Sequence, residues 1–145
     1  GVDRLTPPAG KLRRLMHYGQ TFQSHALHFY YLAAPDLLFG FDADPAIRNV
    51  IGVTLKHPSL AVQGVMMRKF GQEIIKATAG RKIHGTGAIP GGVNKNLSIA
   101  ERDAIRRDIG QMIEWAQEAL KIYERLQHQN LAAARELVER LSADR

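Results

Sequence analysis

The chain has 145 residues, of which 45% are hydrophobic and 23% are charged, a composition typical of one globular domain with a core of its own. Its formal net charge of +6 comes from scattered pairs and triplets of Lys and Arg without a nucleic-acid-binding motif, which argues against a nucleic-acid partner. The sequence contains no cysteine, so disulfides and thiolate metal sites within this chain are excluded. We therefore expect residues 1–145 to form a single domain.

The first predicted helix runs from about Ala9 to Ala34. It follows two prolines, and we expect it to end before Pro35, because proline cannot continue a helix interior. One broad arc of this helix is apolar. The arc is formed by Leu12, Leu15, Phe22, Ala26, Phe29, Tyr30 and Ala33.

A second arc of the same helix is polar but uncharged, and it carries His17, Thr21, His25 and His28. Residues 16–35 include no Asp, Glu, Lys or Arg, whereas a solvent-facing helix side normally carries charges, so we expect this helix to be covered on most sides. The three histidines and two glutamines of this stretch make it too polar for a membrane span. The N-terminal GVDRLTPPAG also lacks the apolar run of a signal peptide, so we expect a cytoplasmic location.

Two further helices are predicted between residues 44 and 79. Asp44 followed by Pro45 is an N-cap and a first-turn proline for a short helix through about Thr54. The second long helix spans Leu60 to Ala79 and stops at Gly80. Its apolar stripe is formed by Val62, Met66, Phe70, Ile74 and Ala77, and Gly64 and Gly71 weaken it slightly.

A glycine-rich segment, RKIHGTGAIPGGVNKN, follows the second long helix. It has no helical period, and its glycines permit tight turns and close approach of the backbone to another group. These glycines are Gly85, Gly87, Gly91 and Gly92. A weak strand signal covers Lys82 to His84.

Ser98 and Glu101 form an S-x-x-E capping box before the third long helix. The predicted apolar stripe of that helix consists of Ile105, Ile109, Met112, Ile113, Ala116, Leu120 and Tyr123. Residues 127–130 interrupt the pattern, and from Leu131 either a kinked continuation or another helix follows. The fold class is therefore all-α, an open bundle of three to four long helices with the glycine-rich loop between the second and third.

Two motifs stand out against this helical background. They are QSHALHFYYLAAPD, from Gln23 to Asp36, and GRKIHGTGAIPGGV, from Gly80 to Val93. Together, and in this order, they resemble the large subunit of nickel-iron hydrogenases. The spacing and the linking FGFDADP look most like the soluble NAD-reducing branch or a close cytoplasmic relative, and the resemblance covers residues 1 to about 126.

The resemblance implies an enzyme that oxidises dihydrogen reversibly, coupled to NAD(P) or another soluble acceptor. In this family the large subunit holds a nickel-iron centre with carbon monoxide and cyanide on iron, and four thiolates from two Cys-x-x-Cys motifs bind it. Neither motif occurs here, so we expect an internal segment that holds no cofactor and is inactive alone. The implied partners are the rest of the large subunit, the small subunit with its iron-sulfur clusters, and diaphorase subunits.

The resemblance also assigns site residues. His25 and His28 match the helix motif and would lie in the interior near the active site, tuning hydrogen bonds or relaying protons, although they could equally be satisfied core histidines. His84 matches a loop histidine that faces the small subunit, but Gly85 follows it where many relatives have proline, which would loosen the loop. Gly91 and Gly92 would lie near the cofactor or the small-subunit interface, and without the resemblance they indicate a plain turn.

Two alternatives stay open at this point. The chain could be a free-standing, non-catalytic helical scaffold derived from the same family, retained for protein contacts. If it is instead a segment of a larger subunit, part of its apolar surface should be exposed, and we expect it to self-associate through its helices. We interpret His17, His57 and His128 as ordinary histidines without a role in either case.

Overall fold

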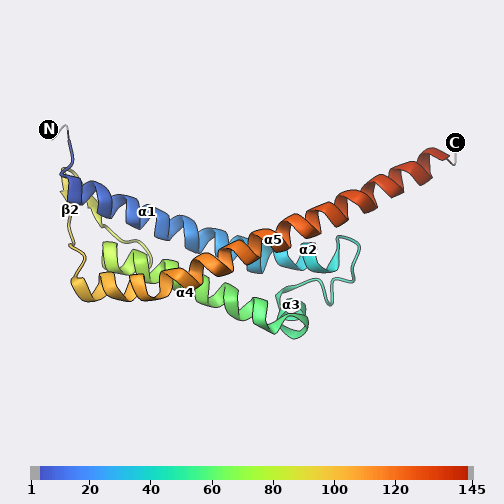
Figure 1. The fold of residues 1–145 in the computed structure, drawn as a ribbon, viewed down its shortest axis with the longest axis horizontal. Coiled ribbons are helices and arrows are strands. Elements are labelled where there is room, and N and C mark those ends of the chain that lie inside the picture. The colour runs from blue at the N-terminus through green and yellow to red at the C-terminus, as the bar shows by residue number, and fades with distance from the viewer. Residues whose placement is uncertain (1–3, 144–145) are drawn as a thin grey trace.

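A computed structural model describes residues 4–143, so the first three and last two residues of the predicted domain lie outside it. Helices dominate the fold, and the predicted all-α class is confirmed. In chain order the elements are α1 (Pro7–Leu27), η1 (His28–Ala33), α2 (Ala34–Phe39), α3 (Val50–Lys56), α4 (Pro58–Ala79), β1 (Ala88–Ile89), β2 (Gly92–Val93) and α5 (Ile99–Ala143). Figure 1 shows α1 and α4 running alongside each other, with α5 crossing them and its C-terminal half extending beyond the bundle.

The chain does not leave the helical path at Pro35, so the predicted end of the first helix is wrong. After α1, one π-helical turn, η1, leads directly into α2. The N–H of Ala34 donates to the carbonyl of Phe29, five residues back, and Pro35 then lies in the first turn of α2. Proline is tolerated there because first-turn N–H groups have no partner within the helix.

The short helix α3 begins at Val50 and not at Pro45, which corrects the predicted start. Asp44 does accept the Ala46 N–H at 2.8 Å, but it caps only an isolated turn. The side-chain oxygen of Asn49 caps α3 by accepting the N–H groups of Ile51 and Gly52 at 2.9 and 3.0 Å. Asn49 therefore restarts the helix after that turn.

Glycines bring α1 and α4 into close contact. A Cβ atom at Gly71 would lie 2.6 Å from Cβ of Gln23 in α1, and one at Gly64 would lie 2.5 Å from Cβ of Tyr30 in η1, directly after α1. A Cβ atom at Gly19 would in turn lie 2.6 Å from Ile74 Cγ2. The glycines that the sequence pattern suggested as weak points are thus the contact surface of the main helix pair.

The C-terminal end of the second long helix is confirmed, since α4 ends at Ala79 and Gly80 follows it in the left-handed conformation, whereas its start at Pro58 lies two residues before the predicted Leu60. Its predicted buried face is only half right. Phe70, Ile74 and Ala77 are buried, but Val62 and Met66 are 59% and 43% exposed. The buried face follows the glycines instead, because α1 can approach α4 most closely there. The core cluster consists of Ala26, Tyr30, Leu60, Met67, Phe70, Ile74 and Met112.

The glycine-rich segment forms a small hairpin at Ala88–Val93, not the predicted strand at Lys82 to His84. β1 and β2 pair antiparallel, with Ala88 opposite Val93 and Ile89 opposite Gly92. Pro90 and Gly91 make the turn, and Gly91 has a φ of 83°. Proline followed by a residue with positive φ is the preference of a type II turn, so Gly91 is the glycine that the turn requires.

The capping box before α5 is confirmed in both directions. Ser98 Oγ accepts the Glu101 N–H at 3.2 Å, and Glu101 Oε2 accepts the Ser98 N–H at 2.9 Å. α5 then continues as one helix through residues 127–130. The sequence QHQN interrupts the apolar pattern there but does not end the helix.

The predicted apolar stripe of α5 is only partly right. Ile105, Met112 and Ala116 of that stripe pack in or against the core, but Ile109, Ile113 and Leu120 are 40%, 51% and 56% exposed. Trp115, outside the stripe, also packs against the core. The bundle touches α5 from one side only, so one apolar face finds neighbours and the other does not. No helix within residues 4–143 is long and apolar enough to cross a bilayer.

Candidate functional site

The two motif histidines of the first helix lie on its surface. His25 lies in the last turn of α1 and His28 begins η1, and both side chains are exposed. The Nδ1–H of His25 donates to the Thr21 carbonyl over 2.8 Å, which fixes the ring against its own helix. In this chain neither residue is a core histidine. The uncharged face that carries them is exposed at His17 and His25. Nothing else within residues 4–143 covers these two residues, although the sequence predicts a helix that is covered on most sides.

The loop histidine and a first-helix histidine meet at one cleft. His84 and His17 both line a cleft of about 570 Å³ between α1, α4 and the residues after Gly80. The other polar side chains of this cleft include Gln20, Gln23, Arg68 and Gln72. The sequence pattern marks His17 as ordinary, and its place on the uncharged arc is the only signal for it. His25 and His28 do not line this cleft.

His84 has a left-handed backbone conformation, with a φ of 51°, which is uncommon for a residue with a side chain. The glycines on its C-terminal side pack closely on the end of α4. A Cβ atom at Gly85 would lie 2.5 Å from Ala79 Cβ, and one at Gly87 would lie 2.7 Å from the Thr78 carbonyl. The missing side chain of Gly85 allows the loop to lie against the end of α4, and the loosening of the loop by Gly85 stays a prediction.

The two glycines of the second motif differ in their roles. Gly91 supplies the positive φ of the turn, whereas a Cβ atom at Gly92 would meet no atom within 4 Å. What Gly92 contributes is its carbonyl, which accepts hydrogen bonds from Nε and Nη2 of Arg13 at 3.1 and 2.9 Å. Nη2 also donates to the carbonyl of Ile89 at 2.5 Å. From the sequence, Arg13 is only one of the scattered basic residues.

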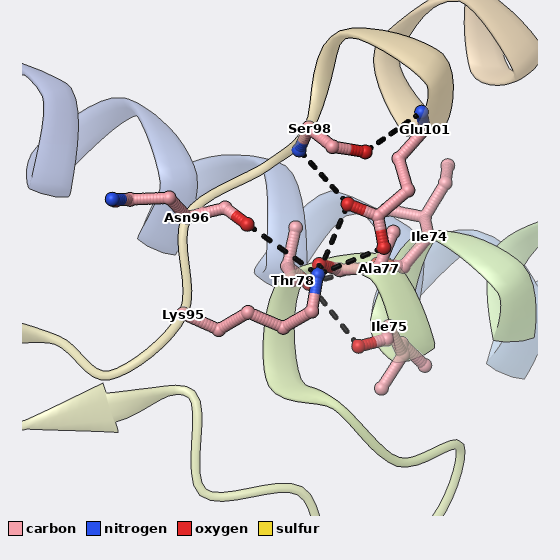
Figure 2. A network of polar contacts seen from close by, with 8 residues as sticks. All are labelled: Ile74, Ile75, Ala77, Thr78, Lys95, Asn96, Ser98 and Glu101. Atoms are coloured by element: carbon pink, nitrogen blue, oxygen red, sulfur yellow. Dashed lines mark hydrogen bonds and ion pairs between the residues drawn. The ribbon is translucent and has the colours of Figure 1, made fainter.

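Lys95 holds the other end of the loop, as Figure 2 shows. Its ammonium group donates to both carboxylate oxygens of Glu101 at 2.8 and 3.0 Å and to the Ala77 carbonyl at 2.6 Å. The end of α4 is thereby tied to the start of α5. The hydrogen bond from Lys95, followed by those from Ser98, lowers the pKa of Glu101 to about 2.

Tyr30, in the first motif, is almost fully buried, at 3% exposure. Its hydroxyl has no hydrogen-bond partner among residues 4–143. Burial raises the pKa of Tyr30 to about 12, and the negative charge of Glu118 adds to this rise. The phenol is therefore neutral and packs as a large apolar group.

The donor set of this chain does not fit a nickel-iron centre. Such a centre requires soft thiolate ligands, and the sequence has no cysteine. Across the part of the chain that the structure describes, no three His, Asp or Glu side chains are grouped closely enough to hold a metal ion. We therefore assign no chemical step through a metal to the residues of this chain.

Comparisons with known proteins identify the fold. No family profile matches the chain. It is 50% identical over 129 residues to a subunit of the F420-non-reducing hydrogenase vhu of Methanocaldococcus jannaschii, covering 89% of this chain and 31% of that protein. It is 49% identical over 125 residues to the NAD-reducing hydrogenase HoxS subunit beta of Cupriavidus necator, covering 82% of this chain and 26% of that protein.

A solved structure agrees with both sequence relatives. The crystal structure of an NAD+-reducing NiFe-hydrogenase in the H2-reduced state superposes with a TM-score of 0.87 and 55% identity over 91% of this chain and 29% of that chain. The chain thus spans between a quarter and a third of the length of the proteins that it matches. The chain belongs to the nickel-iron hydrogenase family and corresponds to a segment of its large subunit.

Proposed function

We propose that this segment serves an enzyme that oxidises dihydrogen reversibly, with electrons passing to NAD(P) or another soluble acceptor, and that it frames the active site without supplying its metal ligands. The observation that carries the proposal is the 55% identity and TM-score of 0.87 to an NAD+-reducing NiFe-hydrogenase over 91% of the chain. Similarity at that level over a whole segment supports a shared role for the segment, beyond a shared fold.

The metal-binding part of the function lies in other segments of the large subunit. A nickel-iron centre with carbon monoxide and cyanide on iron would supply the hydrogen chemistry, held by cysteines that this chain lacks. Iron-sulfur clusters in the small subunit, and diaphorase subunits beyond them, would carry the electrons. We infer a cytoplasmic location for this assembly. The chain's own contribution is a rigid helix pair and a loop that is held at both ends.

We assign the motif residues by their positions in the fold. His25 and His28, on the exposed uncharged face, would be covered by other parts of the large subunit, where imidazoles can accept or relay protons. His84 would face the small subunit from its cleft, and the turn at Gly91 and Gly92 would lie beside the same interface. All three histidines are exposed in the isolated chain, so all three are available for such contacts.

The direct test of the chain's own inactivity uses the chain alone. Purified chain, loaded with nickel and iron salts and then desalted, should retain no stoichiometric nickel by elemental analysis. It should also show no hydrogen uptake with NAD+ or a viologen dye as acceptor. Stoichiometric nickel together with uptake would contradict the proposal, because it would show that the missing thiolates are not needed.

A free-standing helical scaffold from the same family is the second candidate. The observation that favours it is the exposed apolar face of α5, which includes Ile109, Ile113 and Leu120 and offers a contact surface. The reading frame that encodes the chain separates the two candidates. A frame that continues through a Cys-x-x-Cys motif on both sides supports the enzyme segment, whereas start and stop codons at the two ends of the chain support the scaffold.

A further inference from the structure

The hairpin at residues 88–93 makes its main polar contact with α1 through one side chain. Arg13 lies in the second turn of α1, and its guanidinium reaches the facing residues Ile89 and Gly92, which close the turn. Three hydrogen bonds result, from Nε to Gly92 O at 3.1 Å and from Nη2 to Gly92 O and Ile89 O at 2.9 and 2.5 Å. Figure 1 shows this hairpin beside the N-terminal end of α1.

The contact is of a kind that fixes direction as well as distance. A guanidinium is planar and presents its donors in a rigid fork, so two carbonyls bound to it are held at a set angle. None of the ion pairs found within residues 4–143 involves Arg13, so these carbonyls are the groups that its charge meets. The partners are 76 and 79 residues away in the sequence, so the tie joins two distant parts of the chain.

Apart from the packing of Gly85 and Gly87 on the end of α4, few other contacts hold the hairpin in place. Each strand has only two residues, and such a short hairpin is marginal in water. Ala88 is exposed and Ile89 is 38% exposed, so the apolar burial that holds β1 against the bundle comes from part of one side chain. Lys95 ties the far end of the loop to α4, but that contact lies beyond the hairpin.

We propose that Arg13 is the positioning residue of the glycine-rich loop, holding the Ile89–Gly92 turn against α1 so that the loop carrying His84 has its final shape before any partner binds. The inference rests on the proposed function for the identity of the surface that the loop presents. The tie itself is a property of this chain. A preset loop loses less conformational entropy when it docks, so association with a partner is stronger.

Amide hydrogen exchange on the full chain tests the inference. The Asn94 N–H donates to the Gly87 carbonyl at 3.1 Å, next to the hairpin ladder, and reports whether the hairpin is closed. In R13Q its exchange should accelerate about tenfold or more, because hydrogen bonds to a charged group are lost. Amides in the middle of α4 should keep their protection, which separates local opening from unfolding.

Two further variants distinguish positioning from general packing. R13K keeps the charge but not the fork, so it should restore part of the Asn94 protection and part of the native Gly91 and Gly92 amide shifts. R14Q removes a charge from the exposed neighbouring position and should leave exchange unchanged. Equal Asn94 exchange in R13Q and the wild type, or equal acceleration in R14Q, would overturn the inference.

The readout is independent of hydrogenase assembly. Unchanged Asn94 exchange in R13Q would refute the positioning role of Arg13 and would not bear on the proposed function. A hydrogenase chimera that carries this segment and cannot oxidise hydrogen would count against the proposed function. It would not bear on the contact between Arg13 and the hairpin.

Discussion

At the scale of single residues, the buried phenol of Tyr30 shows how a motif residue can act through its bulk. Its ring packs edge-on to Phe29, with centroids 4.9 Å apart, and its Cβ lies where α4 has Gly64. The hydroxyl has no partner among the described residues, and a buried polar group without a hydrogen bond costs stability.

We therefore expect Tyr30→Phe to be neutral or to raise the free energy of unfolding by up to about 1 kcal/mol, because it removes an unsatisfied hydroxyl. Tyr30→Ala should lower it by about 3–5 kcal/mol through the cavity that it leaves. Urea denaturation followed by circular dichroism measures both. A loss of more than about 1 kcal/mol in the Phe variant would show that the hydroxyl is hydrogen-bonded in solution.

Glu101 gives a pH-dependent prediction at the same scale. Its folded pKa of about 2 lies below the ordinary value of 4.5, so the carboxylate stabilises the fold above pH 4.5. That contribution should fall as the pH is lowered from 4.5 through 2, because protons then bind the unfolded chain more strongly. The slope of stability against pH in this window should shrink in Glu101→Gln.

Lys95→Met provides the matched control for this slope, since it removes the main cause of the low pKa of Glu101 and leaves the carboxyl in place. It should flatten the slope in the same window. An unchanged slope in both variants would show that other carboxylates cause the acid sensitivity.

At the scale of elements, the contact between α1 and α4 depends on glycines that helix propensity alone would disfavour. Gly71→Ala should gain up to about 1 kcal/mol of propensity, but the new Cβ atom would lie 2.8 Å from the Gly19 carbonyl, a backbone atom that cannot turn aside. We expect a net loss of about 1–3 kcal/mol.

Gly110→Ala is the matched control, because a Cβ atom there would meet nothing within 4 Å. It should stabilise the chain by up to about 1 kcal/mol. Thermal unfolding of the two variants should therefore shift in opposite directions. A stabilised Gly71→Ala variant would contradict the close crossing of α1 and α4.

The same elements show which features a sequence can predict. The Ser98–Glu101 capping box and the stop at Gly80 depend on residues close in sequence, and both predictions are confirmed. The π-helical turn before Pro35 leaves no such local signal, so the predicted helix end is wrong. The packing face of α5 depends on where the other helices lie, so the apolar pattern marks both residues that pack, such as Met112, and residues that stay exposed, such as Ile113.

The candidate site likewise contains residues that the sequence predicts and residues that only the structure reveals. His84 and Gly91 are predicted from a motif, and the structure places them in one loop. Arg13 and Lys95, which hold that loop, bind backbone carbonyls 79 and 18 residues away. Carbonyls carry no sequence signature, so such contacts are visible only in the folded chain.

At the scale of the whole molecule, the chain leaves considerable apolar surface open. The exposed face of α5 continues to Leu131 and Val138, beyond the bundle. A groove of about 540 Å³ between α4 and α5 adds Met66, which is 43% exposed, to this surface. Exposed apolar area of this extent favours association.

We expect the isolated chain to form a dimer or a higher oligomer through its helices, with a mass that light scattering coupled to size exclusion measures directly. Ile113→Glu and Leu120→Glu should shift the equilibrium toward monomer, because both side chains are more than half exposed and are not needed for the core. Gln117→Glu, on the same helix, is the control for added charge. A monomer at high wild-type concentration would contradict the prediction.

The most direct test of the central claim is a segment exchange in the NAD-reducing hydrogenase of Cupriavidus necator, whose HoxS subunit beta is 49% identical to this chain over 125 residues. The matching segment is replaced by this chain, and hydrogen-dependent NAD+ reduction is measured in the purified complex, with its nickel content as a check on assembly. We expect a nickel-loaded complex that retains roughly a tenth or more of the parental rate, since a faithful frame keeps most of the transition-state stabilisation. A complex that assembles with nickel but shows no hydrogen oxidation would contradict the claim that this segment frames a hydrogenase active site.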